Sequence, residues 1–363
     1  MASLGDILTA RAIGIAWNTY QRDRAVAPFL GRSFFGTQKK DGLDLRWITG
    51  ADGLPVALKG AAFDALAPLR DPIGFSSIEQ EMPFFRESVV TFERDEQEYA
   101  RFAEAGNDTY TEQILRQVMK NPIGLIDGAT IVPERMIWQL IAPADGIPKI
   151  TVTVDGGATY DIAYTSDAGV AYKATNFSSN SGTSLWSAAA TATPIADLIA
   201  MSKKNVTAHG KRITTFVMNA TTWGYLMNAA STRDIVLGTV ASQGGQLLFD
   251  NQVRQFILSN LGATVLVYDK VYANASGVAT PFIPDGVVTG IAEGTSELGT
   301  VWYGTTPEER SGDASIGNLA LVETGVAVYT YTTPHPVNTH TVVSEIVLPS
   351  YENMNDVAVY KVA

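Results

Sequence analysis

The chain of 363 residues contains no cysteine, only three histidines and few charged residues. Without cysteine the protein can form no disulfide bond, no thiolate metal site and no cysteine nucleophile. Charged residues make up 17% of the chain, against about a quarter in an average globular protein. With 46% hydrophobic residues there is ample material for a core, and the shortage of charge suits a subunit largely covered by partners. A secreted β-protein of low charge would have a similar composition.

Long apolar runs are missing as well. No stretch of eighteen apolar residues exists, so we expect no membrane span and no membrane partner. Residues 1–20 do not resemble a signal peptide, because no basic residue precedes the apolar positions and Arg11 interrupts them. These observations favour a protein made and kept in a reducing cytoplasm. The net charge of −11, with only small basic pairs, argues against specific nucleic-acid binding.

Motifs that would indicate catalysis are absent from the sequence. His209, His335 and His340 have no partner at metal-ligand spacing, so a solvated or locally hydrogen-bonded role is expected for each. Residues 294–299 and 312–317 approach the spacing of a nucleophile elbow but break it. We therefore predict no catalytic residue, no metal site and no cofactor, and hence no enzyme.

Periodicity predicts the regular elements. Helices are expected over 3–20 and 94–119, followed by a break at Asn121-Pro122 and a helical pattern over 125–141 in which Pro133 marks a kink or a fresh start. Alternation within 150–172, around the turn Asp155-Gly156-Gly157, predicts a hairpin. The Ser, Thr and Asn content of 175–192 indicates a loop.

The next part of the chain alternates between helix and strand patterns. Helices are predicted at 194–206, 221–230 and 252–261, with Gly262 closing the last, and buried strands at 213–218 and 264–268. This order indicates a compact α/β unit over 194–285. The final third, 287–362, is predicted to consist mostly of strands, with turns at Gly294, Gly304 and Gly312.

Residues 43–93 form the most informative segment. Four prolines interrupt a stretch that is nevertheless rich in aromatic and aliphatic side chains. A long loop of this kind is unusual inside a compact domain, and a disordered linker would be poorer in aromatics. We interpret it as an extended arm that buries its apolar side chains against another molecule. Residues 21–42, also irregular and apolar, read as an N-terminal arm.

Several blocks together resemble the major capsid proteins of tailed phages, in particular the lambda-like major head protein (protein E) family. The C-terminal block carries most of the likeness: Phe282 to Gly286, Tyr303 to Glu308, Ser344 to Pro349, and the strand pattern over 353–359. A second block runs from Ala67 to Ile73, continues with Glu81-Met82-Pro83 and ends in the apolar strand 88–92. The likeness covers nearly the whole chain in order.

The resemblance implies an α+β protein with the tailed-phage major capsid (Johnson) fold. It implies an N-terminal arm (1–42), an extended loop (43–93), a peripheral domain with a long spine helix (94–193 and 286–363) and an axial domain (194–285). It also implies a virion subunit, assembled in the host cytoplasm, whose copies form hexamers and pentamers of an icosahedral shell. Scaffold, portal and decoration proteins would be its partners, and double-stranded DNA would be enclosed without specific contacts.

Candidate contacts between subunits are the aromatic and charged residues of the two arms. They are Phe29, Phe34, Phe35, Arg70, Glu79, Glu81, Phe84, Phe85, Arg86 and Glu87. For each charged residue a solvated surface position is the simpler interpretation. Three other functions stay open: an encapsulin-like compartment around a cargo enzyme, an enzyme built on 194–285, and a β-rich binding module or adhesin. The last would require an export signal.

Overall fold

The structure is a computed structural model that describes residues 8–24, 28–49, 76–104, 108–154, 156–165, 167–238, 248–274, 276–311 and 318–363. The chain divides into two compact units, each assembled from segments that are distant in sequence. The first comprises Met1–Leu45, Gln80–Arg135 and Thr300–Ser350, and the second Arg46–Glu79, Met136–Gly299 and Tyr351–Ala363. One long helix, α4 (Asp108–Ile141), begins in the first unit and ends in the second.

The first unit is built on a six-stranded sheet. Its strands follow the order β1-β13-β16-β15-β14, and β4 pairs with β16 beside this path. Their bounds are β1 Phe35–Lys40, β4 Phe84–Thr91, β13 Gly299–Gly304, β14 Asn318–Glu323, β15 Val326–Pro334 and β16 Val337–Pro349. β16 is buried without interruption from Thr341 to its end, because β15 covers one edge and β4 and β13 share the other.

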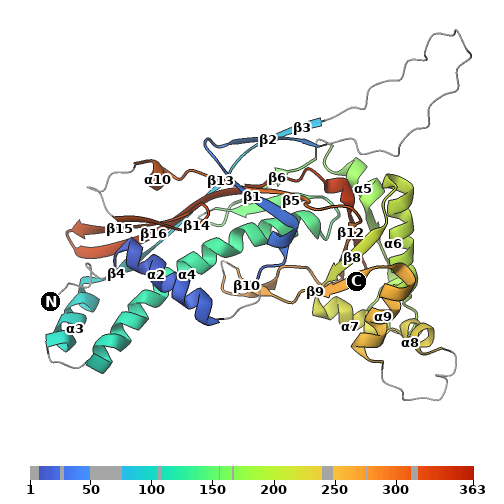
Figure 1. Ribbon diagram of the computed structural model, residues 1–363, viewed down its shortest axis with the longest axis horizontal. Coiled ribbons are helices and arrows are strands. Elements are labelled where there is room, and N and C mark those ends of the chain that lie inside the picture. The colour runs from blue at the N-terminus through green and yellow to red at the C-terminus, as the bar shows by residue number, and fades with distance from the viewer. Residues whose placement is uncertain are drawn as a thin grey trace, which may run out of the picture. The chain divides into compact units, whose positions relative to one another are not determined.

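Helices pack on one face of this sheet and form its core. α2 (Ala10–Arg24) presents Ile13 and Trp17, four residues apart, toward Ile126 of α4 and toward Val328 and Val343 of the sheet. All five side chains are buried. The unit is completed by α3 (Glu93–Glu104), α10 (Pro307–Ser311) and the 3-10 turn η1 (Gly31–Phe34). Figure 1 shows α2 and α4 beside the strands that they cover.

The second unit contains a five-stranded sheet with the order β7-β17-β12-β8-β9. Its strands are β7 Phe177–Ser179, β8 Ile213–Met218, β9 Thr264–Val267, β12 Val287–Ala292 and β17 Val357–Lys361. Its helices are α5 Val170–Asn176, α6 Pro194–His209, α7 Ala220–Asn228, α8 Ala230–Leu237 and α9 Asp250–Leu261. Trp186, Leu198, Phe216 and Ile257 lie in its core. Three further pairs of strands form two-stranded sheets: β2 (Asp44–Thr49) with β3 (Ser76–Glu81), β5 (Lys149–Thr153) with β6 (Thr159–Ala163), and β10 (Val271–Ala273) with β11 (Ala279–Pro281). The 3-10 turns η2 (Gly182–Ser184) and η4 (Met354–Asp356) also belong to this unit.

Several predicted elements are confirmed. β8 has the predicted bounds, the hairpin of β5 and β6 lies where alternation placed it, and α9 ends at Gly262, whose φ of +66° needs a residue without a Cβ. Two helices were missed, α5 and α8, because each is short and polar enough to pass for a loop. β12 and β17, from beyond residue 285, complete the sheet of β8 and β9.

The predicted break at Asn121-Pro122 is wrong. α4 continues through Pro122 and Pro133, and the separation between α3 and α4 falls after Glu104. Each proline removes one backbone hydrogen bond from the helix. Side chains on both sides of Pro122, such as Met119, Ile123 and Ile126, pack into the core and stabilise the helix there. Of the predicted helix 3–20, the structure describes α2 from Ala10, which runs on to Arg24; residues 1–7 lie outside the described part.

The prediction that 21–42 and 43–93 lack regular structure is wrong at both ends. β1, β2, β3 and β4 are strands, and two of them pair with β13 and β16 of the C-terminal third. The apolar strand pattern over 88–92 is borne out by β4, which contains it up to Thr91. The ladders themselves join residues hundreds of positions apart, so no local pattern indicates which strands pair. Residues 50–75 lie outside the described part. The turn predicted at Gly304 is also wrong, because this residue ends the strand β13. Gly294 has a φ of +76°, as expected of a turn. Gly312 lies outside the described residues.

Candidate assembly surface

The N-terminal segment is fastened to α4 by one buried carboxylate. Glu134, which is fully buried, accepts hydrogen bonds from the backbone N–H groups of Gly31 (2.9 Å) and Arg32 (3.1 Å). The guanidinium of Arg32 donates to the carbonyl oxygen of Thr130 at 2.7 Å. An acidic group that accepts bonds from free N–H groups at the start of a turn gains both hydrogen bonds and favourable electrostatics. This arrangement directs the chain from η1 into β1.

The three predicted aromatic contacts of this segment differ in exposure. Phe35 is buried in its own chain, whereas Phe29 and Phe34 are half-buried. The Arg32 guanidinium lies 5.5 Å from the centre of the Phe29 ring, within the range of a cation–π contact. The two half-buried rings therefore keep surface available to a neighbouring molecule.

β4 carries four of the predicted contact residues. Phe84 is 42% exposed and Phe85 is half-buried, while Arg86 and Glu87 are exposed. Arg86 forms an ion pair with Glu308 of α10, and its guanidinium lies 4.8 Å from the centre of the Phe84 ring. Glu308 also accepts a hydrogen bond from the Ser344 hydroxyl at 2.9 Å. The charge of Arg86 is thus used within the chain, and Phe84 is the large apolar side chain of this strand that faces solvent.

The remaining predicted contact residues flank residues 50–75. Glu79 and Glu81 are exposed on β3, and Arg70 lies outside the described residues. The base of this segment is held by a hydrogen bond of 2.9 Å from the Met82 N–H to the Leu43 carbonyl. Leu45, Trp47 and Met82, which precede or follow this segment in the chain, are buried.

Other exposed apolar side chains were not predicted. Ile15 on α2, Leu321 on β14 and Phe92 after β4 are each more than half exposed. Within the described residues, β14 and β4 pair along one edge only. Edges with free backbone groups and exposed apolar side chains are typical of strands that pair with a further chain. Periodicity alone could not find them, because it does not distinguish the two faces of an edge strand.

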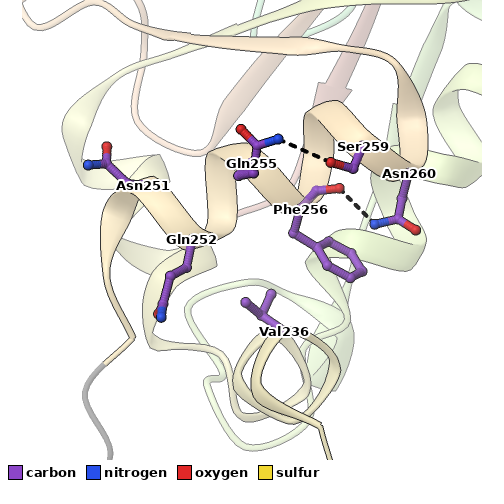
Figure 2. Close-up of a pocket in the computed structure, with 7 residues that line it drawn as sticks. All are labelled: Val236, Asn251, Gln252, Gln255, Phe256, Ser259 and Asn260. Atoms are coloured by element: carbon purple, nitrogen blue, oxygen red, sulfur yellow. Dashed lines mark hydrogen bonds between the residues drawn. The ribbon is translucent and has the colours of Figure 1, made fainter.

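The second unit contributes a groove between α8 and α9 (Figure 2). It has a volume of about 460 Å³ and is lined by Val236, Asn251, Gln252, Gln255, Phe256, Ser259 and Asn260. Gln255 donates to the Ser259 hydroxyl at 3.3 Å and Asn260 to the Phe256 carbonyl at 2.9 Å. None of these seven side chains titrates near neutral pH, so the groove offers amide contacts and no acid–base chemistry.

The start of α9 beside this groove is electrostatically fixed. Asp250 accepts hydrogen bonds from Arg254 (2.6 Å) and from the Trp223 indole N–H (2.7 Å). The bond from Arg254 is the main reason why the pKa of Asp250 lies below its ordinary value. Phe249, directly before the helix, is 64% exposed.

The histidines occupy structural positions. His209 ends α6, and its Nε2 lies 3.2 Å from the Asn176 side-chain oxygen, so it has a hydrogen-bonded role, although its partner is 33 residues away in sequence. His340 stacks on Tyr331 with ring centres 4.8 Å apart. Among the residues that the structure describes, no group of three His, Asp or Glu side chains has metal-binding geometry, and no helix is long and apolar enough to cross a membrane.

Solved structures with a similar fold define the class of protein. A protein from an Escherichia coli CFT073 prophage, assigned as its capsid protein, superposes with a TM-score of 0.60 at 12% identity, over 98% of this chain and 99% of that one. A phage-related protein from Bordetella bronchiseptica RB50 gives a TM-score of 0.50 at 10% identity, over 99% and 98%. The chain therefore has the α+β tailed-phage major capsid (Johnson) fold. No curated protein sequence matches it.

The family follows from the sequence itself. The family described as phage major capsid protein E matches residues 15–358. The chain belongs to this family, and it is a phage major capsid protein: a structural component of the virion that builds a shell with copies of itself. The resemblance on which the sequence analysis relied is thereby confirmed.

Proposed function

We propose that this chain forms hexamers and pentamers of an icosahedral shell that encloses double-stranded DNA. The family match over residues 15–358 is the observation that carries this proposal. The net charge of −11 suits a wall that contacts DNA without gripping it, since binding to phosphate depends on basic side chains. Scaffold, portal and decoration proteins are the partners that such a shell requires, and we place its assembly in the host cytoplasm. Its role is structural rather than catalytic.

Contacts between subunits would use the exposed apolar side chains of the arms. Phe29 and Phe34 are half-buried, Phe84 is exposed, and β2 and β3, on either side of residues 50–75, pair with each other. The N-terminal arm, the extended loop, the peripheral domain and the axial domain would each provide one region of contact with neighbouring subunits. Large obligate interfaces bury roughly 2,000–5,000 Å², which is enough to stabilise arms that cannot fold alone.

Electron microscopy of the purified full-length chain tests the proposal. Closed shells of uniform size, or capsomers that close when a scaffold is added, would support it. Small particles under all assembly conditions, with the scaffold gene coexpressed, would contradict it. An encapsulin-like compartment is distinguished by its content: shells that co-purify with a cargo enzyme and never package DNA in an infected cell would favour the compartment.

A further inference from the structure

Glu345 places an unpaired carboxyl group in the interior of the first unit. It lies on β16, only 1% of its surface is exposed, and neither side-chain oxygen accepts a hydrogen bond from any described residue. An ionised carboxylate in this position would lose its hydration without gaining a partner. Burial accordingly raises the pKa of Glu345 well above its ordinary value. The group stays neutral in a pH range where exposed glutamates are ionised.

The charged groups around Glu345 come from three other elements. Arg32 of η1, Glu323 of β14 and Arg135 of α4 act on its carboxyl group electrostatically. Glu134, next to Arg135 on α4, holds the amides of η1. On β15 and β4 the residues opposite Glu345 are the uncharged Val326 and Phe85, and β13 contributes the phenol of Tyr303, whose pKa burial raises to about 12.

The charges of this cluster balance only while Glu345 is neutral. The cluster then contains two positive groups, Arg32 and Arg135, and two negative ones, Glu134 and Glu323. Ionisation of Glu345 adds a third carboxylate, to which no described residue donates a hydrogen bond in the closed structure. The Nε atoms of both arginines are buried and lack a hydrogen-bond partner among the described residues, so the cluster also holds donors that are not used.

The N-terminal segment contributes Arg32 to the cluster. Nη1 of Arg32 and Oε2 of Glu323 lie 3.6 Å apart, and the two side chains are 31% and 32% exposed, so this pair is the part of the cluster that reaches solvent. The segment is held by the two amide bonds to Glu134 and by the bond from Arg32 to Thr130. Opening η1 would break these bonds and hydrate Glu345.

We propose that Glu345 is a proton-controlled latch for the N-terminal arm: its neutral form keeps residues 28–35 closed over the cluster, and its ionisation opens them. In the open segment the carboxyl group is hydrated and titrates near the ordinary value of about 4.3. In the closed segment it titrates at higher pH. The opening equilibrium therefore increases about tenfold for each pH unit between these two values, and becomes constant above the higher one.

Hydrogen exchange of the full-length chain measures this equilibrium. Peptides that span residues 28–40 are followed by mass spectrometry from pH 4 to 9, with correction for the intrinsic exchange rate. We expect protection of the Gly31 and Arg32 amides to fall about tenfold per pH unit above pH ~4.3 until it levels off. In Glu345→Gln, which cannot ionise, and in Glu345→Met, the protection stays constant with pH.

The matched control is Glu87→Gln, which removes an exposed carboxylate on the adjacent strand β4 and should retain the wild-type pH profile. A pH-independent protection of residues 28–40 in the wild-type chain would overturn the proposal by itself. An unchanged pH profile in Glu345→Gln would overturn it as well, and would assign the titration to another group.

Discussion

At the scale of single residues, the first unit depends on a few polar and glycine positions that no apolar count would single out. Glu134 satisfies two backbone N–H groups inside the fold, and Gly325 turns the chain between β14 and β15 with a φ of +79°. A Cβ at Gly325 would overlap the ring of Tyr303. Glu134 connects segments about a hundred residues apart, and Gly325 lies against the ring of Tyr303 on another strand, so substitution of either is expected to affect the whole unit.

Replacing Glu134 by alanine should destabilise the unassembled subunit by about 2–4 kcal/mol, because it leaves the backbone N–H groups of Gly31 and Arg32 without their charged acceptor. Glu134→Gln keeps one acceptor and should cost less. Urea unfolding measures both. The exposed Glu87→Ala serves as the control and should stay within about 0.5 kcal/mol. Equal stability of Glu134→Ala and the wild type would contradict the role of this residue.

The variants Gly325→Ala and Gly42→Ala separate the cost of a left-handed backbone from the cost of steric overlap with a neighbouring side chain. Both glycines have positive φ, +79° and +92°, but a Cβ at Gly42 meets no atom within 4 Å. We expect about 1 kcal/mol for Gly42→Ala, the cost of the left-handed backbone, and clearly more for Gly325→Ala, where the Tyr303 ring must move. Thermal unfolding of the two variants measures the difference. Equal losses would show that the ring yields freely.

At the scale of elements, β4 both pairs within the sheet of the first unit and presents exposed side chains to solvent. Eight of its residues pair with β16, which makes it part of the sheet, and its outer side chains remain available to a neighbour. Phe84 and Phe85 are adjacent but differ in exposure, so they can be used to separate folding from assembly.

We expect Phe84→Ser to change the free energy of unfolding by less than about 1 kcal/mol and to reduce shell formation strongly, because its ring is largely outside the subunit core. Phe85→Ser should cost about 2 kcal/mol or more of subunit stability, since it removes a half-buried ring beside Glu345. Sedimentation gives the shell yield and denaturant unfolding the stability. A Phe84→Ser chain that assembles like the wild type would remove this residue from the interface.

At the scale of the whole molecule, the two units recruit strands from distant parts of the chain. Because β4 is integral to the first unit, a deletion that tests the extended loop must spare it. Replacing residues 50–75 by a short Gly-Ser linker between β2 and β3 should leave a folded subunit and abolish closed shells. Circular dichroism and negative-stain microscopy of the same sample separate the outcomes. Intact shells from this variant would show that the loop is dispensable for assembly.

The sequence by itself determined the local elements and the family. The periodicity of 213–218 and of 252–261, the closing Gly262 and the ordered blocks up to residue 359 are properties of short stretches, and short stretches are what a linear pattern records. The absence of cysteine likewise excludes a whole class of chemistry without any structure.

Only the tertiary structure decided that β1 is a strand, that β4 begins at Phe84 and pairs with β16, that α4 passes through two prolines, and that Glu345 is buried. Each of these depends on segments that are distant in sequence: β13 and β16 supply the backbone bonds of β1 and β4, α2 and the sheet supply the packing of α4, and β4 and β15 flank Glu345 on β16. The free energy of such contacts arises only when distant segments meet, so it leaves no trace in the neighbouring residues.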